Sequence, residues 1–363
     1  METEDKTKIN LETEETKERD KGSPRVSMEK EEKLFHDYRR KWETSWSSKF
    51  GRCGRFEDTT LLSPMHFTYC APGRIPYAAS TGRTLQFYSI KVAEIKKALG
   101  LTWPLDVYGV VAARDNVDRN RNIIFLRGRD DCQTLTQKDP FLRLTGPSRA
   151  IVTRDPIHLE IELKAKGRTK SEDRVLMTDT WYYRDNYCGL CTLYTPLVTN
   201  LCTIVLSSEE LEESVQATIV GVRIVEGSLP AKKKDSSPPF KYGCRVVCSS
   251  TPLNGILPDS QHITEPSFRQ VVLQDGAMSV CKDGYLDLAR HVVSVELGRR
   301  LKVIVYAYSR SGDIAPRGHI FFDAQKSNVS HGLCYIDDYE VEISVAWSCL
   351  VREKLSILMK GRV

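Results

Sequence analysis

Two features that would direct a chain into a membrane or out of the cell are missing from the sequence. No apolar run approaches the roughly 20 residues that a membrane-spanning helix needs, so we expect no membrane partner. The N-terminus is acidic and polar, without the apolar segment of a secretory signal. The 11 cysteines are scattered without a disulfide framework. We therefore expect reduced thiols and a location in the cytoplasm or the nucleus.

The short motifs of common enzymes are also missing. The sequence has no P-loop, no Gly-x-Ser-x-Gly elbow and no dinucleotide-binding glycine motif. Cys188 and Cys191 have the spacing of a zinc knuckle, and Cys244 and Cys248 would supply a second pair. The second pair falls in an apolar, strand-like run, where cysteine is a common core residue. We therefore expect no cofactor, no metal and no catalytic residue.

A strong net charge is absent as well. The formal charge is +5, and the cationic residues are interspersed with acidic ones. This pattern permits weak attraction to polyanions but argues against nucleic acid as a partner. The basic run Lys232–Lys234 lies in a Pro- and Ser-rich stretch, and we interpret it as a solvated loop.

What the sequence does contain is a succession of strand-like segments. Pro104–Ala113 is apolar and rich in β-branched residues, and His158–Lys164 alternates between apolar and polar side chains. Ser214–Val225 predicts a long strand with a bulge at Gly221, and Ser208–Glu213 before it predicts an acidic turn. Crossover helices are lacking, so we predict a mainly β fold, an antiparallel β-sandwich or open barrel.

Composition divides the chain into five parts. Residues 1–27 are charged and polar, which predicts a disordered tail. Residues 28–50 carry the spacing of one amphipathic helix, and residues 51–82 read as an extended connector that lies along the domain. The all-β domain is expected at residues 83–352, followed by a basic C-terminal tail at residues 353–363.

The predicted helix carries large apolar side chains at every fourth position. A stripe of this size must be covered, either by a groove on a partner protein or by the helix's own domain. We take the stripe as the candidate partner-binding surface for an unknown protein. Its residues are Leu34, Tyr38, Trp42, Trp46 and Phe50.

Two charged loops follow neighbouring predicted strands. A hydrolytic site with two carboxylates would need residues such as Asp115 and Asp131 to meet in a cleft. The alternative is that arginines brace the loops through carboxylates. The candidate functional residues in and near these loops are Arg114, Asp115, Arg127, Arg129, Asp130, Asp131 and Arg149.

Several dispersed motifs resemble a family of cereal-grass proteins that carry the plant domain of unknown function 6598. The motifs are Ser63–Thr68, Trp103–Gly109, Ala112–Asp115, Arg127–Asp131, Leu144–Pro147, Val292–Leu297 and Val341–Trp347. The resemblance covers roughly Gly82 to Val351 and implies no catalytic residue. In some members the domain is joined to a ribosome-inactivating N-glycosidase domain, but no Glu-Ala-Ala-Arg-like helix occurs here, so we expect no toxin activity.

Three functional hypotheses follow from these observations. The first is a non-enzymatic protein-interaction module in a plant stress or defence setting. The second is a hydrolase or sugar-directed enzyme that uses the loop carboxylates, which would require a concave pocket with two converging carboxylates. The third, a regulatory domain associated with ribosome-inactivating proteins, depends on family analogy alone.

Overall fold

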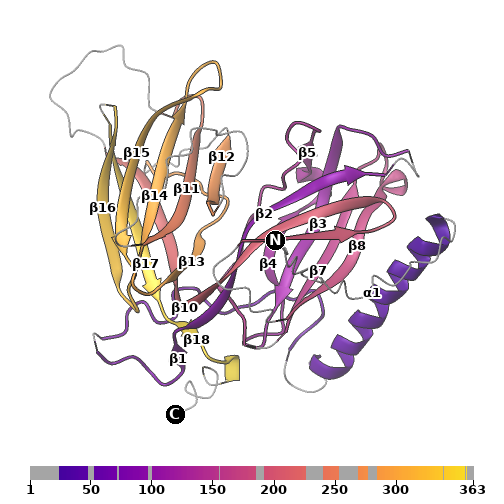
Figure 1. Cartoon of the computed structure of the whole chain (residues 1–363), viewed down its shortest axis with the longest axis horizontal. Coiled ribbons are helices and arrows are strands. Elements are labelled where there is room, and N and C mark those ends of the chain that lie inside the picture. The colour runs from indigo at the N-terminus through magenta and orange to yellow at the C-terminus, as the bar shows by residue number, and fades with distance from the viewer. Residues whose placement is uncertain are drawn as a thin grey trace, which may run out of the picture.

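The chain folds into two β-sandwich lobes, and one long strand takes part in both (Figure 1). The mainly β fold with antiparallel sheets is therefore confirmed, since all pairings between the named strands are antiparallel. This computed structural model describes residues 24–47, 53–71, 73–96, 100–154, 156–184, 192–225, 240–252, 269–276, 284–337, 339–355 and 357. Residues 1–23 of the predicted tail and the Lys232–Lys234 run lie outside these ranges.

The N-terminal lobe packs a five-stranded sheet, in the order β4-β3-β7-β8 with β5 beside β3, against β2, β9 and the first half of β10. Alternate side chains of β7, Ile157, Leu159 and Ile161, are fully buried in the core, as the period of two predicts. The elements of this lobe are β2 (Gly82–Ile95), β3 (Leu105–Arg114), β4 (Asn122–Arg127), the 3₁₀ turn η3 (Arg129–Asp131), β5 (Gln133–Leu135), β6 (Ile151–Val152), β7 (Ile157–Ala165), the 3₁₀ turn η4 (Lys170–Glu172), β8 (Arg174–Tyr183) and β9 (Leu193–Val198).

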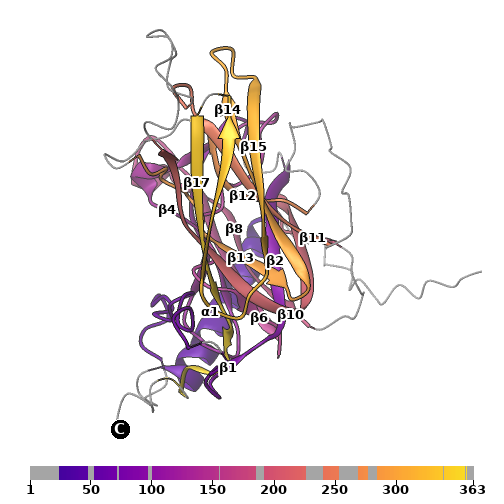
Figure 2. The ribbon, with the colours of Figure 1, turned by 90° about the vertical axis from the view of Figure 1, so that its left-hand side faces the viewer.

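The C-terminal lobe packs the four-stranded sheet β12-β11-β14-β15 against β13, β16, β17 and the second half of β10. Figure 2 views this lobe from its outer side, with β14, β15 and β17 toward the viewer. Val246, Val303 and Trp347 are fully buried in its core. Its strands are β11 (Cys244–Pro252), β12 (Val271–Gly276), β13 (Val292–Glu296), β14 (Arg299–Tyr308), β15 (Ile314–Asp323), β16 (Val329–Ile336) and β17 (Tyr339–Ser348).

The strand that joins the lobes is β10 (Cys202–Val225), which is 24 residues long. Its first half pairs with β2 as far as Ser214, and its second half pairs with β13 and β17. Glu213, with φ 39°, lies where the neighbouring strands change. The predicted bulge at Gly221 is confirmed, because the register with β17 shifts between Ile219 and Gly221. Because one strand belongs to both cores, the lobes are tied to each other.

The predicted acidic turn at Ser208–Glu213 is wrong, because these residues continue β10. Two of the carboxylates in this segment accept hydrogen bonds from tyrosine hydroxyl groups on other strands. Glu209 accepts a hydrogen bond from the Tyr88 hydroxyl at 2.7 Å, and Glu210 accepts one from the Tyr183 hydroxyl at 2.6 Å. Local charge predicted exposure, which is found for Glu212 and Glu213, but side chains distant in the sequence satisfy Glu209 and Glu210.

The segment before β2 and the C-terminal part of the chain meet at one end of the molecule, which we call the base (Figure 1). There β1 (Ala79–Ser80) pairs with β18 (Leu350–Val351). A small apolar core under this pair brings together Phe67, Val117 and Val152. The connector is therefore anchored to the domain at Phe67 and at β1.

Helix α1 (Pro24–Trp46) lies on the outside of the N-terminal lobe, beside β8 (Figure 1). It begins at a proline, which the first helical turn tolerates because the missing N–H has no intrahelical partner there. Glu31 holds Asn200 through a 2.8 Å hydrogen bond to its side-chain amide.

Candidate functional site

The aromatic stripe of α1 packs on its own domain. Tyr38 and Trp42 are 8% and 5% exposed, whereas Leu34 is 61% exposed and Trp46 is partly buried. Phe50 lies outside the described residues. The structure thus shows the alternative in which the helix folds back, and a partner could reach Tyr38 or Trp42 only after α1 had left the sheet.

The surface beneath the stripe is aromatic and cationic. Phe56 makes edge contacts with Trp42 and Tyr38 at centroid distances of 5.4 and 5.9 Å. The Arg114 guanidinium lies 4.7 Å from the Trp42 ring and 4.3 Å from the Phe56 ring, as in cation–π contacts. The Trp42 Nε1–H donates to the Arg119 carbonyl oxygen at 3.0 Å. The helix therefore covers a charged layer.

That layer is a buried ion network on the outer face of β3 and β7. Glu160 is fully buried and accepts from Arg114 Nε at 2.9 Å on one oxygen and from Arg121 Nε on the other. Arg121 also donates to Glu162 at 2.6 Å. Both oxygens of Glu160 are thus held by guanidinium groups in a site that solvent does not reach.

A histidine extends the same surface. His158 stacks on Tyr38 with ring centroids 5.6 Å apart and contacts Tyr182 at 4.3 Å. Burial, with the nearby charges of Arg119 and Arg114, lowers the pKa of His158 to about 4. The imidazole is therefore neutral at physiological pH, and it serves as part of the aromatic cover.

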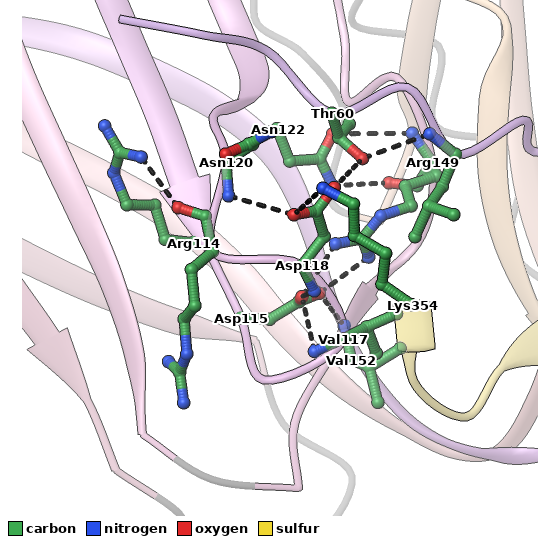
Figure 3. A network of polar contacts seen from close by, with 12 residues as sticks. Thr60, Arg114, Asp115, Val117, Asp118, Asn120, Asn122, Arg149, Val152 and Lys354 are labelled. Atoms are coloured by element: carbon green, nitrogen blue, oxygen red, sulfur yellow. Dashed lines mark hydrogen bonds and ion pairs between the residues drawn. The ribbon is translucent and has the colours of Figure 1, made fainter. Parts of the chain in front are cut away.

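The first predicted loop forms a second buried network (Figure 3). Arg149 donates to both oxygens of Asp115 at 2.7 Å, a bidentate pair that is almost completely buried. The backbone N–H groups of Val117 and Val152 also donate to this carboxylate. The donors to Asp115 come from Arg149, from the loop after β3 and from β6, so the carboxylate braces this loop, as in the bracing alternative of the sequence analysis.

Asp118 connects this network to both ends of the domain. It accepts from the Thr60 hydroxyl of the connector at 2.9 Å and from Lys354 Nζ near the C-terminus at 3.1 Å (Figure 3). Asn122 accepts from the Ser148 N–H at 2.9 Å. The sequence analysis did not select Asp118, although the Asp- and Asn-rich loop that contains it was a visible signal.

The second predicted loop is separate and lies at the surface. Arg127 pairs with exposed Asp131 at 2.8 Å, and Asp131 belongs to η3 together with Asp130. Arg129 instead reaches Asp173 in a bidentate contact at 2.8 and 3.1 Å. This hydrogen bond holds the pKa of Asp173 well below its usual value. Among the described residues, Asp131 pairs with Arg127 and Asp115 pairs with Arg149, so the two carboxylates do not form the two-carboxylate site.

The cysteines give no metal site in the part of the chain that the structure describes. Cys244 and Cys248 are buried in β11, and burial raises the pKa of the Cys244 thiol to about 12. Cys188 and Cys191 lie outside the described residues. Within those residues, no three His, Cys, Asp or Glu side chains are grouped as metal ligands would be.

The base carries a surface that the sequence analysis did not select. Leu61, Tyr69 and Tyr77 are 89%, 81% and 79% exposed. They alternate with anchored residues of the connector, since Phe67 and Ala78 are buried in the core of the base. We call these three exposed side chains the base surface. Tyrosines in a Pro- and Gly-rich connector were a signal for it, but only the fold shows which of them face solvent.

The fold and these sites define an all-β protein of two sandwich lobes with a helix on one side. The chain belongs to the family described as Domain of unknown function (DUF6598), whose model matches residues 84–345. This match confirms the resemblance to the domain family, while the plant origin stays a prediction. Among the described residues, no helix has the length and apolar composition to cross a bilayer.

Comparison with other known proteins adds little. No curated protein matches the chain. Two solved structures of human GIVD cytosolic phospholipase A2, one in complex with methyl gamma-linolenyl fluorophosphonate, show 10% sequence identity and a TM-score of 0.23. The matches cover 75% and 76% of this chain and 33% of the phospholipase chain, so this chain spans about a third of its length. A likeness this weak supports no inference about activity.

Proposed function

We propose that this protein is a non-enzymatic binding module and that a protein partner docks on the base surface, Leu61, Tyr69 and Tyr77. The observation that carries the proposal is the near-complete exposure of three large apolar side chains within one short segment. Single exposed apolar residues are normal on a protein surface, whereas three of this size within residues 61–77 favour an interaction surface.

The backbone beneath this surface is held in place. Asn328 N–H donates to the Thr68 carbonyl oxygen at 2.7 Å, and the Phe67 N–H donates to the Ser348 hydroxyl at 3.1 Å. The two tyrosines therefore project from an anchored segment. A partner that binds them has little backbone entropy to remove, which favours affinity.

The chemistry around the tyrosines also fits a protein interface. The Arg352 guanidinium lies 4.6 Å from the Tyr77 ring, and Arg154 donates to the Arg352 carbonyl oxygen at 3.3 Å. Tyrosine and arginine are the residue types most enriched at interface hot spots. The cationic border favours an acidic partner surface, because complementary charge speeds and orients association.

The test is a cross-linked pull-down from grass leaf extract, the source that the family resemblance implies. We expect a partner that the wild type captures and the Tyr69→Ala/Tyr77→Ala variant loses. Tyr194→Ala, which alters a tyrosine exposed at 59% on β9, is the matched control and should retain it. Retention by the double variant would refute the base surface, and loss with Leu34→Ala alone would assign docking to α1 instead.

The other hypotheses have less support. The hydrolase would use carboxylates such as Asp115, whose oxygens are occupied by Arg149 and by backbone N–H groups. The stress or defence setting and a regulatory role beside ribosome-inactivating proteins come from the family resemblance alone. Neither gains an observation from the geometry.

A further inference from the structure

A cleft between the two lobes is unrelated to the base surface and to α1. Its volume is about 260 Å³, and its walls come from β2, the end of β4 and the loop after β5 on one side, and from β11 and β12 on the other. Leu144 belongs to the core of the first lobe, whereas Leu273 belongs to the core of the second. We call it the interlobe cleft.

Three arginines line the interlobe cleft: Arg127, Arg143 and Arg245. Arg127 uses one nitrogen for Asp131, and its buried Nε has no hydrogen-bond partner. Arg143 is exposed and makes no ion pair with any described residue. Its Nη1 lies 3.5 Å from the position that a Cβ on Gly276 would take, so this side chain reaches from the first lobe to β12 of the second.

A fourth arginine, Arg290, is buried next to the lining of the interlobe cleft. Arg290 follows Ala289 of the cleft lining, and its backbone N–H donates to the Leu273 carbonyl oxygen at 3.0 Å. The side chain is fully buried and donates to the Phe87 carbonyl oxygen at 2.8 Å, but its Nε and Nη1 have no hydrogen-bond partner. A buried cation without a carboxylate adds positive potential that no protein charge cancels nearby.

Two of the lining arginines have acidic partners, since Arg127 pairs with Asp131 and Arg245 pairs with Asp275. Asp275 accepts a hydrogen bond from the Tyr308 hydroxyl and lies 3.9 Å from Arg245 Nε, which is a loose ion pair. Asp139 is the other acidic residue of the lining. Among the described residues at the cleft, Arg143 in the lining and buried Arg290 behind it are therefore the cations that no carboxylate pairs.

We infer that the interlobe cleft binds a small organic anion, a carboxylate attached to a compact apolar body. Guanidinium groups recognise carboxylates through paired hydrogen bonds, which supplies the anionic end. Tyr88, Leu144 and Leu273 supply apolar walls for the body. The cleft, with a volume of about 260 Å³, suits a compact ligand such as a monocyclic aromatic carboxylate.

Isothermal titration of the full chain tests this inference with benzoate as the probe and benzamide as its neutral counterpart. We expect benzoate to bind and benzamide to bind at least about tenfold more weakly. Arg143→Gln should weaken benzoate binding about tenfold or more, because a charge-assisted hydrogen bond is lost. Arg310→Gln changes an exposed arginine of the β14–β15 hairpin and should leave the affinity unchanged.

The circular dichroism and thermal midpoint of each variant show whether it is folded. Equal benzoate affinity in the wild type and in folded Arg143→Gln would refute the assignment, and so would equal binding of benzamide and benzoate. Inorganic phosphate is the third probe. If phosphate binds more tightly than benzoate, the cleft is not built for an apolar body and the inference fails in that form.

Discussion

Arg290 offers a direct test of how the C-terminal lobe treats a buried charge. Its side chain is fully buried, it makes one hydrogen bond to the Phe87 carbonyl oxygen, and two of its nitrogens have no partner. Replacement by Met keeps a long, flexible side chain in the core and removes the guanidinium. We expect Arg290→Met to be at least as stable as the wild type.

The magnitude follows from two opposing effects. Burial lowers the pKa of Arg290 from its ordinary value to about 10. At about 1.36 kcal/mol per pKa unit, the buried charge destabilises the folded state by about 3 kcal/mol. The lost hydrogen bond to Phe87 contributes roughly 1.5–3 kcal/mol in the other direction. The expected gain in the free energy of unfolding is therefore between zero and about 2 kcal/mol.

The pH of the measurement follows from the sign of the pKa change. The folded-state pKa lies below the unfolded one, so the penalty is complete below pH 10 and disappears only as the pH rises further. Urea unfolding at pH 7 therefore reports the whole effect. Arg310→Met, at an exposed position, is the control and should change stability by less than about 0.5 kcal/mol.

A loss of more than about 2 kcal/mol in Arg290→Met would refute this reasoning, because it would mean that the guanidinium is fully satisfied in the folded protein. The same variant is also expected to bind benzoate less tightly, since Arg290 stands behind the cleft wall. A gain in stability together with weaker binding would show that the lobe retains a costly charge for its ligand.

Three further predictions concern the outer face of the first lobe. Trp42→Ala should lower the free energy of unfolding by about 3–5 kcal/mol in urea titration, and a change below about 1 kcal/mol would mean that α1 is held elsewhere. The folded-state pKa of His158 is about 4, below the usual 6.5. The free energy of unfolding should therefore be highest above pH 6.5 and should fall as the pH drops toward 4. Thermal midpoints across this range check it, and His158→Gln should flatten the curve. Glu160→Gln leaves buried Arg114 without a carboxylate and should destabilise by about 3–5 kcal/mol in calorimetry, whereas an unchanged midpoint would show that solvent reaches the network.

Local pattern predicted the strands well because their period is a property of neighbouring residues. The alternation in β7 placed Leu159, Ile161 and Leu163 in the core, and Gly221 marked the bulge in β10. Local sequence patterns could not predict that the strands divide into two lobes. The division depends on which strands pair with each half of β10, and these partners come from distant parts of the chain.

The sequence predicted which interactions the candidate residues make better than it predicted where on the fold they lie. Bracing between arginines and carboxylates was one of the stated alternatives, and the Asp115–Arg149 pair has that form. The interlobe cleft could not be predicted, because Arg143 and Arg245 lie far apart in the sequence and only the packing of the lobes brings them together. Exposure of Tyr69 and Tyr77 was equally a matter of how the connector is anchored.

One sequence pattern acquires a different meaning in the fold. The alternation of His158–Lys164 predicted a wet face, yet Glu160 on that face is fully buried. The aromatic stripe of α1, together with Phe56, covers the arginines that hold Glu160. An aromatic ring can cover a guanidinium without removing its hydrogen bonds, because the cation meets the ring face while its N–H groups remain in the plane. The stripe and the charged face are therefore complementary surfaces of one protein. This complementarity explains why the helix is so aromatic. It also explains why the outer face of β7 carries a carboxylate that is not exposed to water.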